Sequence, residues 1–259
     1  MSKDIIIMGG SGTGKSTSLR NFKKDEICLV NVIGKELPFR SSFEETLNCD
    51  NYATIQNFIA RTQKKIVVID DAQYLMSNQY MNRAKEKGFD KFTEIGQNFW
   101  NFINFCKSLP QDVTVYFLIH TEIDPDGREK VKTIGKMIDE KICLEGMFTV
   151  VLKTMIDKDR NYMISTHSNG LDTVKSPMDM FTRDYVPNDL KYIDDIVRDY
   201  YGLKELTKCE ICGNIITATS KKTVEEIIEG TKKNIGKCVC WNCFVEEWNK
   251  KSKSKEKQS

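Results

Sequence analysis

The sequence contains no long run of apolar residues. The apolar run closest to its start covers only residues 5–8. A membrane-spanning helix needs about 20 such residues, and the apolar part of a signal peptide needs about 7–15. We therefore expect no membrane span, no export signal and no membrane partner, and we expect the protein to act in the cytoplasm.

The chain also lacks an excess of either charge. Its 39 Lys and Arg residues nearly balance 37 Asp and Glu residues, which leaves a formal net charge of +2 over 259 residues. This balance argues against a protein coated in basic surface, although it is compatible with a local basic face. Apolar residues make up 40% of the chain, enough to bury a core. The length fits one full domain and one small module.

Strand-like and helix-like segments alternate over the first 155 residues. This alternation favours an α/β fold with a mostly parallel sheet flanked by helices. The expected strands are 5–8, 27–33, 66–69, 113–119 and 148–152, with another at 162–166. The expected helices are 15–23, 52–62, 93–108 and 189–201, with a short one at 72–76 and a loop or short helix at 77–92.

Residues 9–16 read GGSGTGKS, which fits the phosphate-loop pattern G-x-x-x-x-G-K-[ST]. Glycines allow backbone N–H groups to converge on a phosphate, and a following helix adds partial positive charge. Lys15 is expected to reach the β- and γ-phosphates and to act in catalysis, while Ser16 offers a hydroxyl to Mg²⁺. The pattern therefore predicts Mg·ATP as the bound species. The expected nucleotide-binding residues are Gly9, Gly10, Ser11, Gly12, Thr13, Gly14, Lys15, Ser16 and Thr17.

Two aspartates follow the strand expected at 66–69. In a phosphate-loop fold, the acid that ends this strand lies beside the loop, so Asp70 is the expected partner of Mg²⁺. Asp71 stands where a carboxylate would orient or deprotonate the attacking water. The alternative is that both aspartates only cap the strand or the next helix. Glu36, just after the second strand, is a rival for the base.

Histidine is scarce, and one of the two histidines follows the fourth expected strand. A polar residue there can sense the γ-phosphate through the attacking water, so His120 is a candidate catalytic residue. A purely structural histidine at a strand end is the alternative.

These motifs together resemble the phage-encoded RecA-like AAA-type ATPases, which include the Sak-type single-strand annealing proteins. The phosphate loop, the Asp-Asp strand end and the strand end at 119–122 (IHTE) carry the resemblance. So do the stretches 133–136 (TIGK), 145–149 (EGMFT) and 175–178 (KSPM). The resemblance covers about residues 4–181.

The resemblance implies ATP hydrolysis tied to phage DNA recombination or replication in the host cytosol. It also implies single-stranded DNA as a partner, possible contacts with phage replication or recombination proteins, and a homo-oligomer whose subunits complete each other's sites. Arg128, Lys136 and Lys175 would then be candidate phosphate sensors or contacts to a neighbouring subunit. The alternative is that all three are ordinary surface cations.

Nine cysteines divide into two groups. Cys28, Cys49, Cys106 and Cys143 stand alone in apolar contexts and are expected to be reduced core residues. Two C-x-x-C pairs near the C-terminus can supply four thiolates to one tetrahedral, structural Zn²⁺. The expected zinc ligands are Cys209, Cys212, Cys240 and Cys243, although Cys238 could replace Cys240. A redox-active or merely reduced set is the alternative.

We therefore expect an ATPase core at 1–185, a linker helix at 186–206, a four-cysteine module at 207–249 and a disordered lysine-rich tail at 250–259. Within the module, helices are expected at 223–233 and 244–250. Its lysines and Trp241 are compatible with nucleic acid, a protein partner or stability alone.

Two alternatives to a DNA-directed ATPase remain open. A nucleotide kinase is disfavoured because the chain has only eight arginines and shows no arginine-rich lid. A nucleotide-gated helicase loader or interaction scaffold would bind ATP but turn over little.

Overall fold

The computed structural model describes residues 1–40, 42–135, 142–203, 207–214, 216–217, 219 and 222–256. The chain forms two compact units, Met1–Gly202 and Leu203–Ser259. Among the described residues, no helix is long and apolar enough to cross a bilayer.

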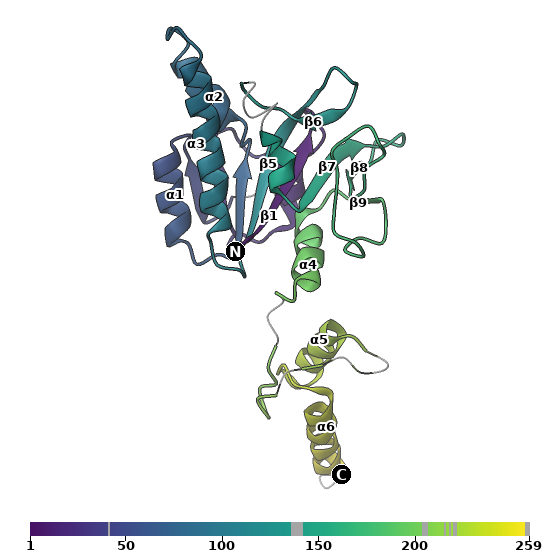
Figure 1. Ribbon diagram of the computed structural model, residues 1–259. Helices are drawn as coiled ribbons and strands as arrows, with labels where there is room; N and C mark the ends of the chain where they lie inside the picture. The colour runs from purple at the N-terminus through teal and green to yellow at the C-terminus, as the bar shows by residue number, and fades with distance from the viewer. Residues whose placement is uncertain are drawn as a thin grey trace. The chain divides into compact units, whose positions relative to one another are not determined.

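The first unit is built on a nine-stranded sheet (Figure 1). Its order is β3-β2-β4-β5-β1-β7-β8-β9, with β6 paired to β5. Pairing is parallel from β3 to β7 and antiparallel at β7-β8, β8-β9 and β5-β6. The strands are β1 (Lys3–Gly9), β2 (Ile27–Asn31), β3 (Glu45–Asn48), β4 (Ile66–Asp70), β5 (Thr114–Ile123), β6 (Glu129–Val131), β7 (Val150–Ile156), β8 (Tyr162–Ser165) and β9 (Tyr185–Pro187).

Helices cover both faces of this sheet. One face packs against α1 (Tyr52–Arg61), α2 (Tyr74–Asn82) and α3 (Asp90–Lys107), and the other packs against the 3₁₀ helix η1 (Ser16–Asn21) and α4 (Leu190–Tyr200). Ile6 in β1 belongs to the first core and its neighbour Ile5 to the second. Such strands are apolar at every position because both faces are buried. The expected α/β class, with a mostly parallel sheet flanked by helices, is confirmed.

Three details of the first unit differ from expectation. The helix expected at 15–23 is the six-residue η1, because the Ser18 hydroxyl donates to the Lys15 carbonyl oxygen at 2.6 Å and competes for α-helical hydrogen bonds. The edge strand β3 was not expected, since its sequence ETLN is polar and only partly buried. The helix expected to end at residue 76 continues as α2 to Asn82.

The strand order determines where the polar strand ends meet. Strand β5 lies between β1 and β4, and its His120 is in register with Gly9 of β1. Asp70 ends β4. Because these strands are parallel, the phosphate loop, the acid and the histidine lie at one edge of the sheet.

The isolated cysteines follow the prediction in part. Cys28 and Cys106 are buried, and Cys49 is partly buried against the core. The prediction for Cys143 was wrong, since this residue is exposed. Its neighbour Leu144, the first residue of the 3₁₀ helix η3 (Leu144–Met147), is buried instead.

The helix α4 packs on the sheet rather than standing apart as a linker. Its Leu190, Ile193 and Val197 are fully buried in the core of the first unit, which extends to Gly202. The apolar residues at helical spacing that predicted this helix therefore pack in the core of the first unit, and the helix is not a linker.

The described part of the second unit includes the helices α5 (Val224–Ile235) and α6 (Trp241–Glu256). Thr223 caps α5 in a reciprocal capping box with Glu226. A small apolar cluster that includes Ile216, Ile227 and Val239 fills the space between them. Helix α6 continues past Lys250, where we expected a disordered tail to begin, and residues 257–259 lie outside the described residues.

A buried carboxyl group on α4 makes stability depend on pH. Burial raises the pKa of Asp194 to about 6 from its ordinary value of 3.8, although the Tyr116 hydroxyl donates to it at 2.8 Å. The folded state therefore holds this proton more tightly than the unfolded state. The resulting stabilisation is complete below about pH 4 and is lost as the pH rises through about 6.

Asp194→Asn removes this titration and keeps an acceptor for Tyr116. At about pH 8 we expect the variant to exceed the wild type in free energy of unfolding by up to about 3 kcal/mol, the equivalent of two pKa units. At about pH 4 the two proteins should agree. Urea unfolding at both pH values measures the difference, and an equal difference at both would contradict the assignment.

Candidate nucleotide and metal sites

The phosphate loop joins β1 to η1 and is held from two sides. Gly12 and Gly14 have φ angles of 80° and 95°, which favour glycine. The Thr13 hydroxyl donates to the Gly10 carbonyl oxygen at 2.9 Å, and it lies 2.7 Å from the hydroxyl of Thr154 on β7. From the other side, the Asn188 amide donates to the Gly14 carbonyl oxygen at 2.9 Å. The loop is therefore preorganised.

Lys15 is 6% exposed and lies inside the loop. Its ammonium group donates to the carbonyl oxygens of Gly9 and Gly10 at 2.7 and 2.9 Å, and lies 3.3 Å from His120 Nδ1. Burial lowers the pKa of Lys15 to about 8, while the negative charges of Asp71 and Asp70 oppose this change. A desolvated cation in this position is suited to bind a phosphate oxygen.

Ser16 and Asp70 meet directly, as predicted for a Mg²⁺ site. The Ser16 hydroxyl lies 3.0 and 2.8 Å from the two carboxylate oxygens of Asp70. Burial raises the pKa of Asp70, and so does the charge of Asp71. A cation would favour the ionised carboxylate, and hydroxyl and carboxylate oxygens are the ligands that Mg²⁺ takes beside phosphates. These two residues therefore fit the ion.

Asp71 is 1% exposed and has a φ of 60°, which is uncommon outside glycine. It forms an ion pair with Lys35, from the segment after β2, and its Oδ1 lies 3.3 Å from His120 Nε2. Burial alone would raise the pKa of Asp71, but the hydrogen bonds from His120 and Lys35 outweigh it and lower the pKa. The unusual backbone conformation places a fixed, ionised carboxylate toward the cleft.

A cleft of about 680 Å³ opens over these groups. The rival base Glu36 lines it too, but is exposed at its rim. Gln73 accepts a hydrogen bond from the His120 backbone N–H at 3.1 Å and fixes this histidine in the cleft. Lining residues that the sequence did not single out are Ile33, Lys35, Pro38, Gln73, Tyr74, Ser77, Lys132 and Tyr162.

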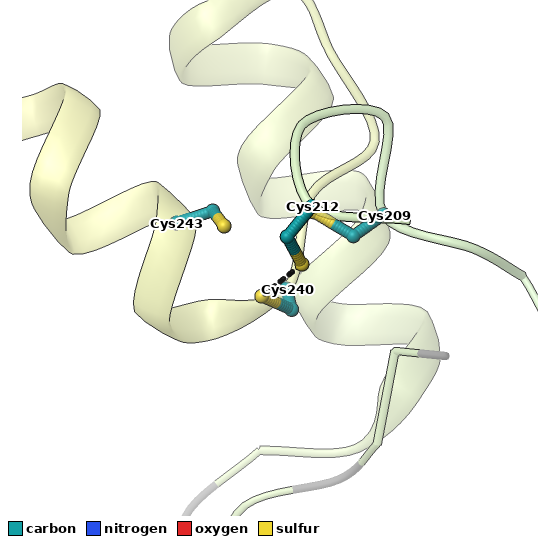
Figure 2. Close-up of side chains that lie close together, drawn as sticks. All are labelled: Cys209, Cys212, Cys240 and Cys243. Carbon is teal, nitrogen blue, oxygen red and sulfur yellow. Dashed lines mark hydrogen bonds between the residues drawn. The ribbon is translucent and has the colours of Figure 1, made fainter. Parts of the chain in front are cut away.

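The four predicted zinc ligands come together in the second unit (Figure 2). Their Sγ atoms all lie within 4.8 Å of one another, and those of Cys212 and Cys240 are 3.8 Å apart. With Zn–S bonds of about 2.3 Å, a tetrahedral site has S–S distances of about 3.8 Å. The cluster is therefore compatible with a structural zinc ion.

The local backbone supports a metal site. Gly213 has a φ of 73° and donates its N–H to the Cys209 carbonyl oxygen at 2.9 Å, which closes the turn after the first pair. Burial opposes ionisation of Cys209, but the backbone N–H groups of Cys212, Cys240 and Ile211 lower its pKa to about 6. Cys240 immediately precedes α6, and Cys243 lies in its first turn.

The choice between Cys238 and Cys240 is also answered by the geometry. Cys240 belongs to the four-cysteine group, and Cys238 does not. Instead, the backbone of Cys238 pairs with Glu210: its N–H donates to the glutamate carboxylate at 2.7 Å, and its carbonyl oxygen accepts at 2.9 Å. The backbone of Cys238 therefore stabilises the turn between Cys209 and Cys212, in which Glu210 lies.

No protein-family model and no curated protein sequence matches the chain. Among solved structures, the chain is similar to a KaiC-like protein from the hyperthermophilic archaeon Pyrococcus horikoshii, with 13% identity and a TM-score of 0.37. The match covers 63% of this chain and 78% of the archaeal chain. Activity and ligands are therefore inferred from this chain's own residues.

Of the three expected contacts to a neighbouring subunit, the two that the structure describes, Arg128 and Lys175, do not line the cleft. Arg128 is exposed in the turn between β5 and β6, where its N–H donates to Asp124 at 2.8 Å. Lys175 is exposed and pairs by its backbone with Val151. Lys136 lies outside the described residues. The role of these two exposed cations at a neighbouring subunit stays a prediction.

The Lys35–Asp71 ion pair leads to a pH prediction. Lys35→Met removes a group that lowers the pKa of Asp71, so this pKa should rise. If activity requires the Asp71 carboxylate, the acidic limb of the pH–rate profile moves to higher pH. Lys35→Arg keeps the charge and should keep the wild-type limb. If the acidic limbs of the Met and Arg variants coincide, Lys35 does not set the pKa on which activity depends.

Proposed function

We propose that this protein binds Mg·ATP in the cleft of the first unit and hydrolyses it. The convergence of Lys15, Ser16 and Asp70 carries the proposal. The first two come from the loop after β1, Asp70 ends β4, and the Ser16–Asp70 contact joins residues 54 positions apart. A chance glycine turn would not bring a buried lysine, a hydroxyl and a buried carboxylate to one point.

Each residue then has a distinct role. Lys15 and the loop N–H groups bind the phosphates and stabilise the charge that develops on them. Ser16 and Asp70 would hold Mg²⁺, which supplies further charge neutralisation when bound. Asp71 orients the attacking water, and His120, which contacts both Asp71 and Lys15, links the water to the phosphate end.

Phosphate release from ATP by the purified protein tests this function. We expect inorganic phosphate to form with Mg²⁺ and not with EDTA. Transfer of phosphate to added nucleotides instead of water would indicate a kinase. ATP binding with almost no phosphate release would favour the helicase loader or scaffold. The ion pair between Lys35 and Asp71 favours this alternative, because it holds the carboxylate that would otherwise orient the attacking water.

We further propose that the protein couples ATP hydrolysis to work on single-stranded DNA in phage recombination or replication. It would act in the host cytosol as a homo-oligomer, with phage proteins as partners. The sequence resemblance supports this role. The exposed Arg128 and Lys175 offer contacts to a neighbouring subunit. In the second unit, which a structural zinc would stabilise, Lys222 Nζ lies 4.4 Å from the centre of the Trp241 ring, a pairing of cation and aromatic surface that suits nucleic acid.

The DNA role is tested by ATPase rates with and without single-stranded DNA, together with binding at several salt concentrations. We expect stimulation, and binding that weakens steeply as salt rises. Neither stimulation nor binding at low salt would remove the DNA role while leaving the ATPase proposal standing.

A further inference from the structure

We propose that a second hollow beside the phosphate loop, built around Tyr162 and Arg160, binds the nucleotide base and selects purine over pyrimidine nucleoside triphosphates. This inference rests on the proposed function, because it extends the same bound nucleotide past its phosphates. The hollow has a volume of about 370 Å³ and is lined by Thr17, Arg20, Arg160, Asn161 and Tyr162.

The phosphate loop sets the direction in which a nucleotide must lie. Asp71 and His120 mark the end where the terminal phosphate reacts. Thr17 lies away from that end of the cleft, after Ser16, so we assign the sugar and base of a bound nucleotide to its side. Thr17 and Tyr162 line both the phosphate cleft and the second hollow, so the two spaces adjoin there. A base that leaves the phosphates at Thr17 enters this hollow.

Tyr162 lies against the phosphate loop, and its ring is still accessible to a ligand. A side chain on Gly14 would place its Cβ 2.8 Å from Tyr162 Cδ1, so the ring and the loop are in close approach. Asn188 fixes both parts: its N–H donates to the Tyr162 carbonyl oxygen at 3.2 Å, and its side chain donates to Gly14. Tyr162 is nevertheless 47% exposed. A fixed, half-exposed aromatic ring is a stacking surface for a base.

Arg160 adds a second flat group in a costly backbone conformation. It is exposed with a φ of 64°, where arginine is rare. Asp157 enforces the turn, because its carboxylate accepts from the N–H groups of Asp159 and Asn161 at 2.9 and 2.7 Å. Such a conformation persists only where surrounding bonds hold it, as those to Asp157 do here. The turn carries the guanidinium to the hollow, where it can stack on or bond to a base.

The lining explains the expected selectivity. Among the described lining residues none carries a carboxylate, and one of the two Asn161 side-chain N–H groups already donates to Asp157 at 3.0 Å. Stacking on the Tyr162 ring depends on the area of the base rather than on the edge that distinguishes adenine from guanine. Larger purine rings should bind better than pyrimidines, and ATP and GTP should bind alike.

Calorimetric titration with Mg·ATP and with Mg·tripolyphosphate, which has no base, tests the proposal. For Tyr162→Ala we expect roughly tenfold weaker binding of Mg·ATP and unchanged binding of Mg·tripolyphosphate. Tyr162→Trp should retain wild-type affinity. Tyr185→Ala is the matched control, since Tyr185 is also a 47% exposed strand tyrosine but lines neither space.

A second pair of variants tests Arg160 without straining the turn. Arg160→Gly keeps the positive φ and removes the guanidinium. It should therefore weaken the binding of Mg·ATP and leave the binding of Mg·tripolyphosphate unchanged. Asp179→Gly makes the same backbone change at another residue, which has a φ of 63°, and should change the affinity for neither ligand. In the wild type, ATP and GTP should bind more tightly than CTP and UTP.

The outcomes separate this proposal from the one on which it rests. A wild-type protein that binds neither Mg·ATP nor Mg·tripolyphosphate overturns both. If the wild type binds both ligands, while Tyr162→Ala and Arg160→Gly bind Mg·ATP normally, only the base site is overturned. Equal affinity for purine and pyrimidine nucleotides would overturn the selectivity.

Discussion

Lys15→Ala should abolish ATP turnover and leave the fold intact. The side chain supplies the one cation inside the described phosphate loop, and the loss of such a charge contact in a dry site lowers rates by about 100- to 1000-fold. Stability should change little, because the loss of the hydrogen bonds to Gly9 and Gly10 is offset by removal of a buried charge, whose desolvation lowers the pKa of Lys15 to about 8. Phosphate release and thermal unfolding of the purified variant measure the two effects.

Lys23→Ala is the control for the loss of any lysine near the loop, since Lys23 is exposed just after η1. It should keep both turnover and melting temperature. Normal turnover by Lys15→Ala would remove the central claim about this cleft. A Lys15→Ala protein that is unfolded would instead show that the lysine is needed for the loop itself, and Lys15→Met would then replace it in the assay.

Cys240→Ser should empty the zinc site and unfold the second unit. A structural zinc ion contributes about 10–16 kcal/mol in small zinc modules, far more than a cluster of a few apolar side chains can supply. Zinc content should fall from about one ion per chain to near zero. The residues from Leu203 onward should become sensitive to protease, while Met1–Gly202 stays resistant.

Cys238→Ser is a closely matched control, two positions away and with the same chemical change. It lies outside the four-cysteine group, so zinc content and protease resistance should match the wild type. Loss of zinc in both variants, or in neither, would contradict the assigned ligand set. A wild-type protein purified without zinc, and insensitive to chelators, would favour a reduced or redox-active cluster instead.

The sequence was most informative where a ligand dictates residue types at short range. The phosphate loop and the two C-x-x-C pairs each have strict local spacing, and both came together as predicted. Asp70 could be placed because it ends a clearly apolar strand. In each case the chemistry requires particular residue types at positions that a fold class already determines.

Residues that reach the cleft from distant loops could not be found in this way. Lys35 follows β2 without any motif, yet it forms the ion pair with Asp71. Tyr162 and Asn188 meet the phosphate loop only because β8 and β9 fold back beside it. A single lysine, tyrosine or asparagine in a sequence has many surface roles, and only the tertiary pairing distinguishes one of them.

The hydrogen bond between Asn188 and Gly14 also bears on how the protein is made. It joins residues 174 positions apart, so this contact of the phosphate loop must wait until nearly the whole first unit has left the ribosome. Contacts of such long sequence separation form slowly, because the intervening chain must be ordered first. A nascent chain that stops before β9 carries every letter of the phosphate motif and still lacks one of the two anchors that hold the loop in shape.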